Sequence, residues 1–296
     1  MDIDLLKTFL EINRTRHFGQ TAENLYLTQS AVSARIRLLE ETLGVPLFTR
    51  ARNDIQLTPA GTRLLKYAES ILNAWNRARQ DTALGGQDKV SLAIGASFSL
   101  WDILLQAWVN ALYHELPGVA LQAEALSPEV LIRRLRDGAL DIAFLFEPPQ
   151  MADLQVCEVA LIKLIMVADR PGLSAREAVS RNYIMTHWGT SFAVAHARHF
   201  PDMPPPAVRM GLGRMAQAFV LHNGGATYLA EQMASEFLES GRLHRVSDAP
   251  VIDRQIHAVY PLASERKQLL ERALALLAPP HPAPALACDD LALPVS

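Results

Sequence analysis

Two groups of polar side chains in the first 60 residues have the chemistry to contact a nucleic acid. The first group lies around a predicted helix start and offers hydroxyl, amide and guanidinium groups; its members are Thr28, Gln29, Ser30, Ser33, Arg35 and Arg37. Such side chains hydrogen-bond to base edges in the major groove. The second group, Arg50 and Arg52, suits phosphate contacts or a narrow minor groove, where the negative potential is strong. Together the groups predict double-stranded DNA as a partner.

A helix that begins just after Thr28 must position the first group. The Thr28 hydroxyl is a good N-cap because it can accept from an unpaired amide of the first turn. At about 100° per residue, one stripe of this helix is apolar and is expected to be buried; it consists of Val32, Ile36, Leu39 and Leu43. Ser30, Ser33, Ala34 and Arg37 then face outward, and Gln29 joins them in the first turn.

The flanking sequence predicts the other parts of a DNA-binding head. A short helix over residues 19–26 and the turn Leu27-Thr28 precede the capped helix, and an apolar-faced helix over residues 5–12 lies upstream. After Gly44, a helix stop, residues 45–50 and 55–58 read as strands around a loop that contains Arg52. A polar helix face and a turn by themselves indicate only a solvated surface. Here helix, turn, helix and basic hairpin follow in the order of a winged helix-turn-helix.

Three segments resemble the LysR-type transcriptional regulators, namely LLKTFLEI, AENLYLTQSAVSARIRLLEETLGVPLFTR and LTPAG. Residues 14–33 are most similar to the HdfR-type subgroup of this family. The resemblance implies a bacterial regulator that binds promoters, pairs through a linker helix and commonly forms a homotetramer, with RNA polymerase as a further partner. In the family the second helix usually carries a basic residue followed by Gln, where this chain has Ala34 and Arg35.

Length and charge agree with a DNA-binding head joined to a larger domain. The chain has 296 residues, of which 50% are hydrophobic, so it can bury a second core. Residues 1–79 hold 11 Lys and Arg against 8 Asp and Glu, a net charge of +3, whereas the whole chain carries −3. DNA affinity is therefore expected in the N-terminal part.

The predicted fold class is α/β overall, in four parts. They are a mostly helical winged helix-turn-helix domain over residues 1–60, a linker and dimerisation helix with a hinge over 61–88, a two-lobed α/β effector-binding domain over 89–277, and a flexible tail over 278–296. The tail is rich in Pro and Ala and lacks periodicity. We expect the hinge at residues 84–87.

One long helix is predicted from about Thr58 to Thr82, with an apolar side formed by Leu64, Leu65, Ala68, Ile71, Leu72 and Trp75. This stripe is too wide for a free linker, and a coiled-coil-like homodimer covers it most simply. Packing of the stripe onto the second domain of the same chain is the alternative.

Beyond Lys89, apolar strands alternate with amphipathic helices, which predicts a mostly parallel sheet with helices on its faces. Two rounds of this pattern indicate two lobes. The family resemblance implies a periplasmic-binding-protein-like fold in which the chain crosses between the lobes twice, near Lys163 and near Leu262.

Several side chains follow predicted strands, where ligands of open parallel sheets bind. We expect a small-molecule effector to contact some of Ser97, Phe98, Ser99, Ser127, Phe146, Thr186 and His187. The amides at the helix start after Ser97 suit a carboxylate or another anion. The competing interpretation for each single residue is a helix cap or a core side chain; only their joint placement indicates a site.

No catalytic residue, cofactor or metal site is predicted. GxSxG, P-loop and dinucleotide-binding motifs are missing from the sequence, and His196 and His199 are expected to be packing or surface histidines. Cys157 and Cys288 lack the spacing of a disulfide framework or a zinc site, which favours the cytoplasm. No apolar run is long enough to span a membrane. A receptor or enzyme whose N-terminal domain binds protein is the alternative function, and weak salt dependence of its binding would distinguish it.

Overall fold

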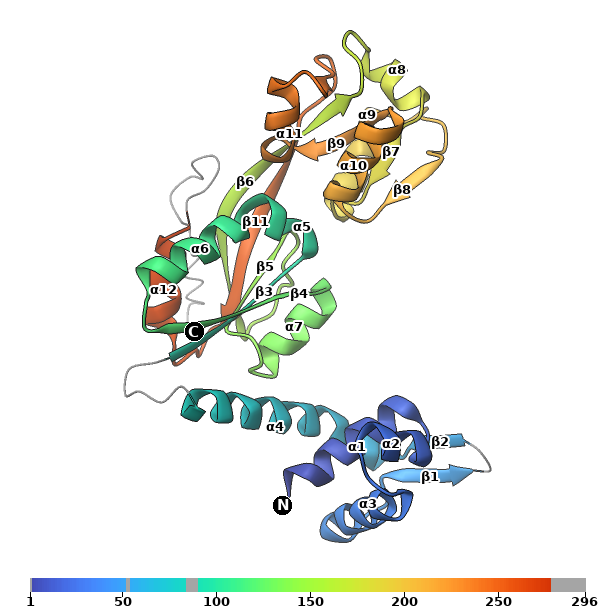
Figure 1. Cartoon of the computed structure of the whole chain (residues 1–296), viewed down its shortest axis with the longest axis vertical. Helices are drawn as coiled ribbons and strands as arrows, with labels where there is room; N and C mark the ends of the chain where they lie inside the picture. The colour runs from blue at the N-terminus through green and yellow to red at the C-terminus, as the bar shows by residue number, and fades with distance from the viewer. Residues whose placement is uncertain (1, 52–53, 84–89, 278–296) are drawn as a thin grey trace, which may run out of the picture. The chain divides into compact units, whose positions relative to one another are not determined.

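The computed structural model describes residues 2–51, 54–83 and 90–277 (Figure 1). The chain divides into two compact units. Unit 1 comprises Met1–Lys89 and Arg136–Ala139, and unit 2 comprises Val90–Leu135 and Leu140–Ser296. The predicted hinge at residues 84–87, the tip of the hairpin at 52–53 and the tail from 278 lie outside the described residues.

Unit 1 contains the predicted helices and hairpin. Its elements are α1 (Ile3–Thr15), α2 (Phe18–Asn24), α3 (Gln29–Leu43), β1 (Phe48–Ala51), β2 (Asp54–Leu57) and α4 (Pro59–Ala83). The two strands pair antiparallel, with Phe48 opposite Leu57. The core joins α1 to α3 and to the hairpin through Leu6, Phe9, Ile12, Val32, Ile36, Leu39 and Phe48. This arrangement confirms the winged helix-turn-helix.

Leu43 was expected on the buried stripe of α3, and this prediction is wrong. Its side chain is 40% exposed, whereas Val32, Ile36 and Leu39 are buried. The helix ends directly after Leu43, because Gly44 adopts a left-handed conformation (φ 71°) that reverses the chain. The last turn therefore extends past the core.

The long helix α4 has two apolar sides, of which one packs in the core of unit 1 and the other is exposed. Ala68 is buried in the core of unit 1, with Leu64 and Leu65 packed beside it. Tyr67, Ile71 and Trp75 are 69%, 36% and 45% exposed. These three residues are spaced four apart and therefore form one stripe along the helix.

Unit 2 consists of helices around one seven-stranded sheet. Its elements are β3 (Val90–Ala96), α5 (Phe98–Leu100), the π-helix η1 (Trp101–Leu105), α6 (Gln106–Glu115), β4 (Val119–Ala125), α7 (Pro128–Arg136), β5 (Ile142–Leu145), β6 (Leu154–Ala168), α8 (Ala175–Ser180), β7 (Ile184–Thr186), α9 (Thr190–His199), β8 (Val208–Met210), α10 (Gly213–Asn223), β9 (Ala226–Ala230), α11 (Glu231–Glu239), β10 (His244–Arg245), β11 (Ile252–Pro261) and α12 (Lys267–Ala275). The pair β7–β8 forms a separate parallel sheet.

Two long antiparallel strands run through both lobes (Figure 1). Strand β6 pairs with β11 from Leu154 opposite Pro261 to Leu164 opposite Ile252. The register shifts between Ile256 and His257, so that Val159 of β6 has no partner of its own. We define lobe I as residues 90–135, 140–160 and 257–277, and lobe II as residues 161–256.

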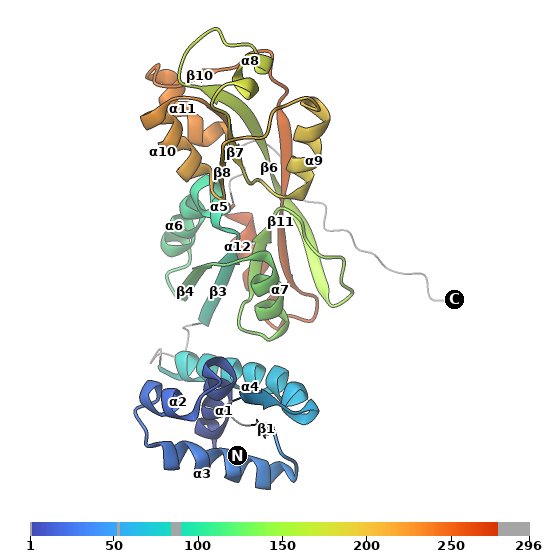
Figure 2. The ribbon, with the colours of Figure 1, turned by 90° about the vertical axis from the view of Figure 1, so that its right-hand side faces the viewer.

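The strands β4, β3 and β5 extend the sheet in lobe I, with helices on both of its faces (Figure 2). Leu92 and Ile94 of β3 belong to the same core as α6 and α12. Ala93, which points to the opposite face, belongs to the core that contains Leu131 and Leu135 of α7. The Trp108 indole donates to the Ala273 carbonyl at 2.7 Å and so joins α6 to α12.

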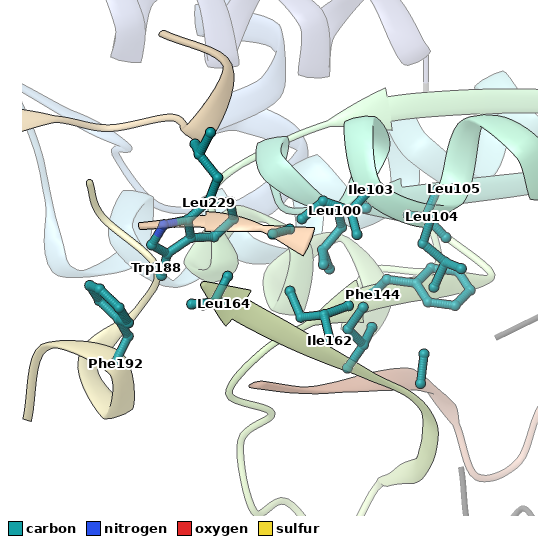
Figure 3. Close-up of a cluster of buried hydrophobic side chains, with 14 of the residues drawn as sticks. Leu100, Ile103, Leu104, Leu105, Phe144, Ile162, Leu164, Trp188, Phe192 and Leu229 are labelled. Atoms are coloured by element: carbon teal, nitrogen blue, oxygen red, sulfur yellow. The ribbon is translucent and has the colours of Figure 1, made fainter. Parts of the chain in front are cut away.

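The larger core continues from lobe I into lobe II along β6 (Figure 3). Ile162 and Leu164 lie between Phe144 in lobe I and the lobe II side chains Trp188 and Phe192. The Trp188 indole donates to the Tyr228 carbonyl at 2.9 Å, which fixes the ring in this position. The two lobes therefore share a hydrophobic core in addition to the two crossing strands.

Two topological expectations need correction. The main sheet is not mostly parallel: only β3–β4 and β3–β5 pair parallel, whereas β6 pairs antiparallel with β9, β10 and β11, and β11 pairs antiparallel with β5. Alternating strands and helices identify the elements but not the pairing direction of the long strands. The second crossing lies at residues 253–256, beside 160–163, and not near Leu262, which follows β11 in lobe I.

The buried pair His196–Tyr183 in lobe II makes stability depend on pH. The Tyr183 hydroxyl and His196 Nε2 lie 2.8 Å apart, and burial, together with the charge of His199, lowers the pKa of His196 to about 4. The unfolded chain therefore binds a proton that the folded chain does not, between about pH 6.5 and pH 4. We expect lobe II to lose about 3 kcal/mol of stability as the pH falls through this window. Denaturant unfolding at several pH values measures this loss, which His196→Phe should reduce.

The control for this prediction is His222→Gln, which changes an exposed histidine of α10. This variant should keep the pH dependence of the original chain. An unchanged pH dependence in His196→Phe would show that His196 is not its source.

Candidate nucleic-acid interface and interlobe site

The start of α3 presents a polar surface to solvent. The Thr28 hydroxyl accepts from the Ala31 amide at 3.2 Å, which confirms the predicted N-cap, and lies 2.9 Å from the Ser30 hydroxyl. Gln29, Ser30 and Arg37 are exposed, and Ser33 is half-buried. Ser30 and Arg37 lie on the side of the helix away from the buried Val32 and Ile36, Ser33 lies at the border of that side, and Gln29 lies in the first turn. The surface has the small, hydrogen-bonding side chains that enter a major groove without a clash.

Arg35 lies differently from its neighbours. Its guanidinium lies 3.4 Å from the Thr8 hydroxyl and 3.5 Å from the Asp4 carboxylate, both on α1. Thr8 is buried, and Asp4 also pairs with Lys7. This arrangement favours a packing role for Arg35, at the place where the family usually has Gln. The exposed Ala34 next to it offers no charge.

The hairpin is held against α3 and α4 by contacts that the sequence did not indicate. The Glu40 carboxylate of α3 accepts from the Leu47 amide at 2.7 Å and from the Phe48 amide at 3.3 Å, where the hairpin begins. Gly61 packs so closely that an added Cβ would collide with the Leu47 carbonyl oxygen. The side chain of Arg50 and the whole of Arg52 lie outside the described residues, so their predicted DNA contacts remain predictions.

In lobe I, the predicted effector residues lie at one edge of the sheet. The Ser97 amide donates to the Phe144 carbonyl at 3.2 Å, and the Leu126 amide donates to the Ala96 carbonyl at 3.0 Å. Ser97, Ser127 and Phe146 therefore follow neighbouring strand ends. Phe98 is 50% exposed, whereas Ser99 is buried. The hydroxyl of Ser127 donates to the Glu129 carboxylate in the first turn of α7, which gives this side chain a local partner.

In lobe II, the predicted residues border a pocket of 330 Å³. Its lining comprises Met185, Thr186, His187, Trp188, Gly189, Phe192, Ala193, Arg209, Met210 and Gly211. His187 is exposed. The Thr186 hydroxyl is buried and lies 2.8 Å from the Thr227 hydroxyl. This contact agrees with the interpretation of Thr186 as a core side chain. The size of the pocket suits a small molecule.

Two charged contacts between the lobes were missed by the sequence reasoning. Asp102 of η1 pairs with Arg214 of α10 at 2.8 Å. Glu147, which follows β5, accepts from the Ser191 amide of α9 at 2.7 Å and pairs with Arg254 of β11 at 3.2 Å. Glu147 and Arg254 are 107 residues apart, so no local spacing marks them.

Within residues 2–51, 54–83 and 90–277, no three His, Cys, Asp or Glu residues are grouped so as to hold a metal ion. None of the helices described for this chain combines the length and apolarity that crossing a bilayer requires. His196 is buried in an aromatic cluster and His199 is exposed.

The winged helix-turn-helix and the two-lobed domain together define a class of DNA-binding regulator. Residues 3–62 match the model of the bacterial regulatory helix-turn-helix protein, lysR family, and residues 85–279 match the LysR substrate binding domain. The chain belongs to the LysR family of transcriptional regulators.

Among curated relatives, the chain is similar to the HTH-type transcriptional regulator HdfR. Identity to the protein of Yersinia enterocolitica is 37% over 283 residues, which cover 93% of this chain and 95% of the relative. Identity to the protein of Salmonella typhimurium is 38% over 273 residues, with coverages of 91% and 96%. The predicted resemblance to the HdfR-type subgroup is confirmed.

Solved structures of low identity share the fold. CbnR, a LysR family transcriptional regulator, superposes with a TM-score of 0.71 at 15% identity, covering 94% of this chain and 100% of CbnR. Vibrio fischeri DarR in complex with DNA gives a TM-score of 0.55 at 22% identity, with coverages of 93% and 99%.

A substitution at the N-cap of α3 tests whether Thr28 stabilises the polar surface at the start of this helix. Thr28→Ala removes the bond to the Ala31 amide, and loss of such a cap costs about 1 kcal/mol. We expect faster hydrogen exchange in the first turn of α3. Thr42→Ala is the matched control, since the Thr42 hydroxyl donates to the Leu38 carbonyl near the other end of the same helix. Equal exchange at the first turn in both variants would contradict a capping role for Thr28.

Proposed function

We propose that α3 enters the major groove of operator DNA and reads bases with Gln29, Ser30, Ser33 and Arg37. The observation that carries this proposal is the exposed polar face at the start of α3, opposite a face buried against α1. Thr28 and Arg35 contribute by holding the helix, through its cap and through the contact with α1. Arg50 and Arg52 are assigned to phosphate contacts or the minor groove.

We assign the chain's parts as residues 1–60 for DNA binding, 61–88 for dimerisation and the hinge, 89–277 for effector binding and 278–296 for a flexible tail. The exposed stripe of Tyr67, Ile71 and Trp75 supports pairing of α4 with a second copy. A homotetramer then places two such pairs on one operator. The solved complexes of CbnR with its target DNA and of DarR with DNA contain relatives of the same fold.

The regulatory mechanism in this proposal is conformational. A small molecule between the lobes favours one lobe arrangement and shifts the placement of the paired DNA-reading heads, which changes DNA bending and the access of RNA polymerase. Candidate contacts are Ser97, Phe98, Phe146 and His187, with Ser99, Ser127 and Thr186 as supporting positions. We assign no enzymatic activity, since the curated relatives are regulators, and we place the chain in the cytoplasm, where its DNA is.

The experiment that tests DNA binding compares DNA from upstream of the chain's own gene with a scrambled duplex across a salt series. Release of counterions from phosphates makes the affinity of a DNA-binding protein fall steeply as salt rises. We expect preference for the upstream DNA and a footprint that spans successive helical turns. Binding that neither prefers this DNA nor responds to salt would favour the alternative in which the N-terminal domain binds protein.

Ser33→Ala and Arg37→Ala test base reading. Each loses a hydrogen-bonding group that faces away from the core, and the expected cost is roughly fivefold to 100-fold in affinity for the specific site. Affinity for scrambled DNA should change little with Ser33→Ala. Arg50→Ala, by contrast, should weaken binding to both duplexes similarly. Fluorescence anisotropy measures the affinity of each variant and of the original chain for both duplexes, and equal losses on both duplexes for Ser33→Ala would contradict its assignment to base reading.

Trp75→Glu tests pairing through α4. Pairing through α4 would bury this exposed stripe, and burial of a charge is costly, so we expect the variant to have the mass of a smaller oligomer by light scattering. Arg63→Glu, at an exposed polar position of the same helix, is the control. An unchanged mass, together with a lower melting temperature of the second domain, would instead support packing of α4 onto that domain.

A further inference from the structure

Glu147 connects the lobes by placing its carboxylate on the start of a helix. The residue follows β5 of lobe I, and its Oε1 accepts from the Ser191 amide at 2.7 Å. Ser191 lies in the first turn of α9, a helix of 10 residues in lobe II. Unpaired amides and the helix dipole make such a start favourable for an anion. Here the anion is supplied by the chain itself.

Arg254 provides a buried cation at the same point. Its side chain is 5% exposed, and its Nη2 lies 3.2 Å from Glu147 Oε1. The guanidinium also lies over the Phe146 ring, 5.0 Å from the centroid. The buried Nε atom has no hydrogen-bond partner among the residues that the structure describes. A buried charge of this kind is costly without a counter-ion, so an anion must occupy the position opposite Arg254.

The backbone beside this pair is shaped to leave space for the charged groups. Gly189 has a φ of +93°, and a Cβ there would lie 2.7 Å from Arg254 Nη2 and 3.2 Å from Glu147 Oε1. Any side chain at this position would therefore fill the site. Burial raises the pKa of Glu147, but the hydrogen bonds from Ser191 and the charge of Arg254 outweigh this effect, and the pKa is lowered overall. The carboxylate stays ionised near neutral pH.

The two charges differ in how firmly they are held. The Glu147 side chain is 40% exposed, whereas Arg254 is buried. The cation is therefore enclosed by the fold, while the carboxylate is partly accessible to solvent. Gly189 also lines the 330 Å³ pocket of lobe II. Apolar side chains of this pocket therefore lie next to the charged groups, where they suit the organic part of an anion.

We propose that Arg254 and the first amides of α9 form a carboxylate-binding site between the lobes, and that Glu147 fills this site as an internal ligand until the carboxylate of an effector displaces it. The regulatory part of this inference rests on the effector response proposed above. Displacement removes one of the two charged contacts between the lobes, because only the pair Asp102–Arg214 then remains among those described. Binding of a carboxylate is therefore coupled to the arrangement of the lobes.

The test is chemical rescue with acetate on the full chain. Glu147→Ala empties the site, and we expect a lower Tm that sodium acetate restores and sodium chloride of equal ionic strength does not. The original chain should gain less, because its own carboxylate competes. Asp102→Ala is the matched control: it removes the other carboxylate between the lobes, which pairs with an exposed Arg214 rather than with a buried cation. Acetate should not restore its Tm.

Failure of acetate to raise the Tm of Glu147→Ala, or an equal rise in Asp102→Ala, would overturn the proposal. If Glu147→Ala does not fold, Glu147→Gln keeps the size of the side chain without its charge, and calorimetry should show tighter acetate binding than in the original chain. Equal acetate affinities would again overturn the proposal. None of these measurements uses DNA, so failure of this site and failure of DNA binding give different results.

Discussion

The pairing of β6 with β11 is the constraint on which the second unit depends. The two strands run side by side from Leu154 opposite Pro261 to Leu164 opposite Ile252 and are the only strands described here that serve both lobes. The partnerless Val159 lies where they leave lobe I, and a bulge of this kind bends a strand and increases its twist. Hydrogen bonds of this ladder and the apolar residues of β6 together determine how the lobes meet.

The interlobe charges depend on this crossing. Arg254 lies on β11 at the crossing itself, between the parts of the strand that belong to the two lobes. Glu147 and Ser191 belong to different lobes and meet beside it. The polar contact between the lobes therefore joins a residue of the crossing strand to two residues that come from different lobes.

Much of unit 1 was predictable because its signals are local. Thr28, Gly44 and the spacing of Val32, Ile36 and Leu39 each determine structure within a few residues, and the structure confirms them. The exposed Leu43 shows the limit of periodicity, which does not tell where the core ends. In unit 2 the alternation of strands and helices was predicted, but the antiparallel direction of β6 and β11 was not, because pairing depends on residues about 100 positions apart. The same reason hid Glu147, whose partners Ser191 and Arg254 are both remote in sequence.

The close contact between Gly61 and the Leu47 carbonyl makes the base of the hairpin and the start of α4 one rigid joint. The Thr58 hydroxyl strengthens this joint, since it donates to the Pro46 carbonyl at 2.7 Å and accepts from the Gly61 amide at 3.0 Å. A helix of 25 residues extends about 38 Å from this point. In the proposed pair joined through α4, the fixed length of this helix would set the separation of the two winged helix-turn-helix domains.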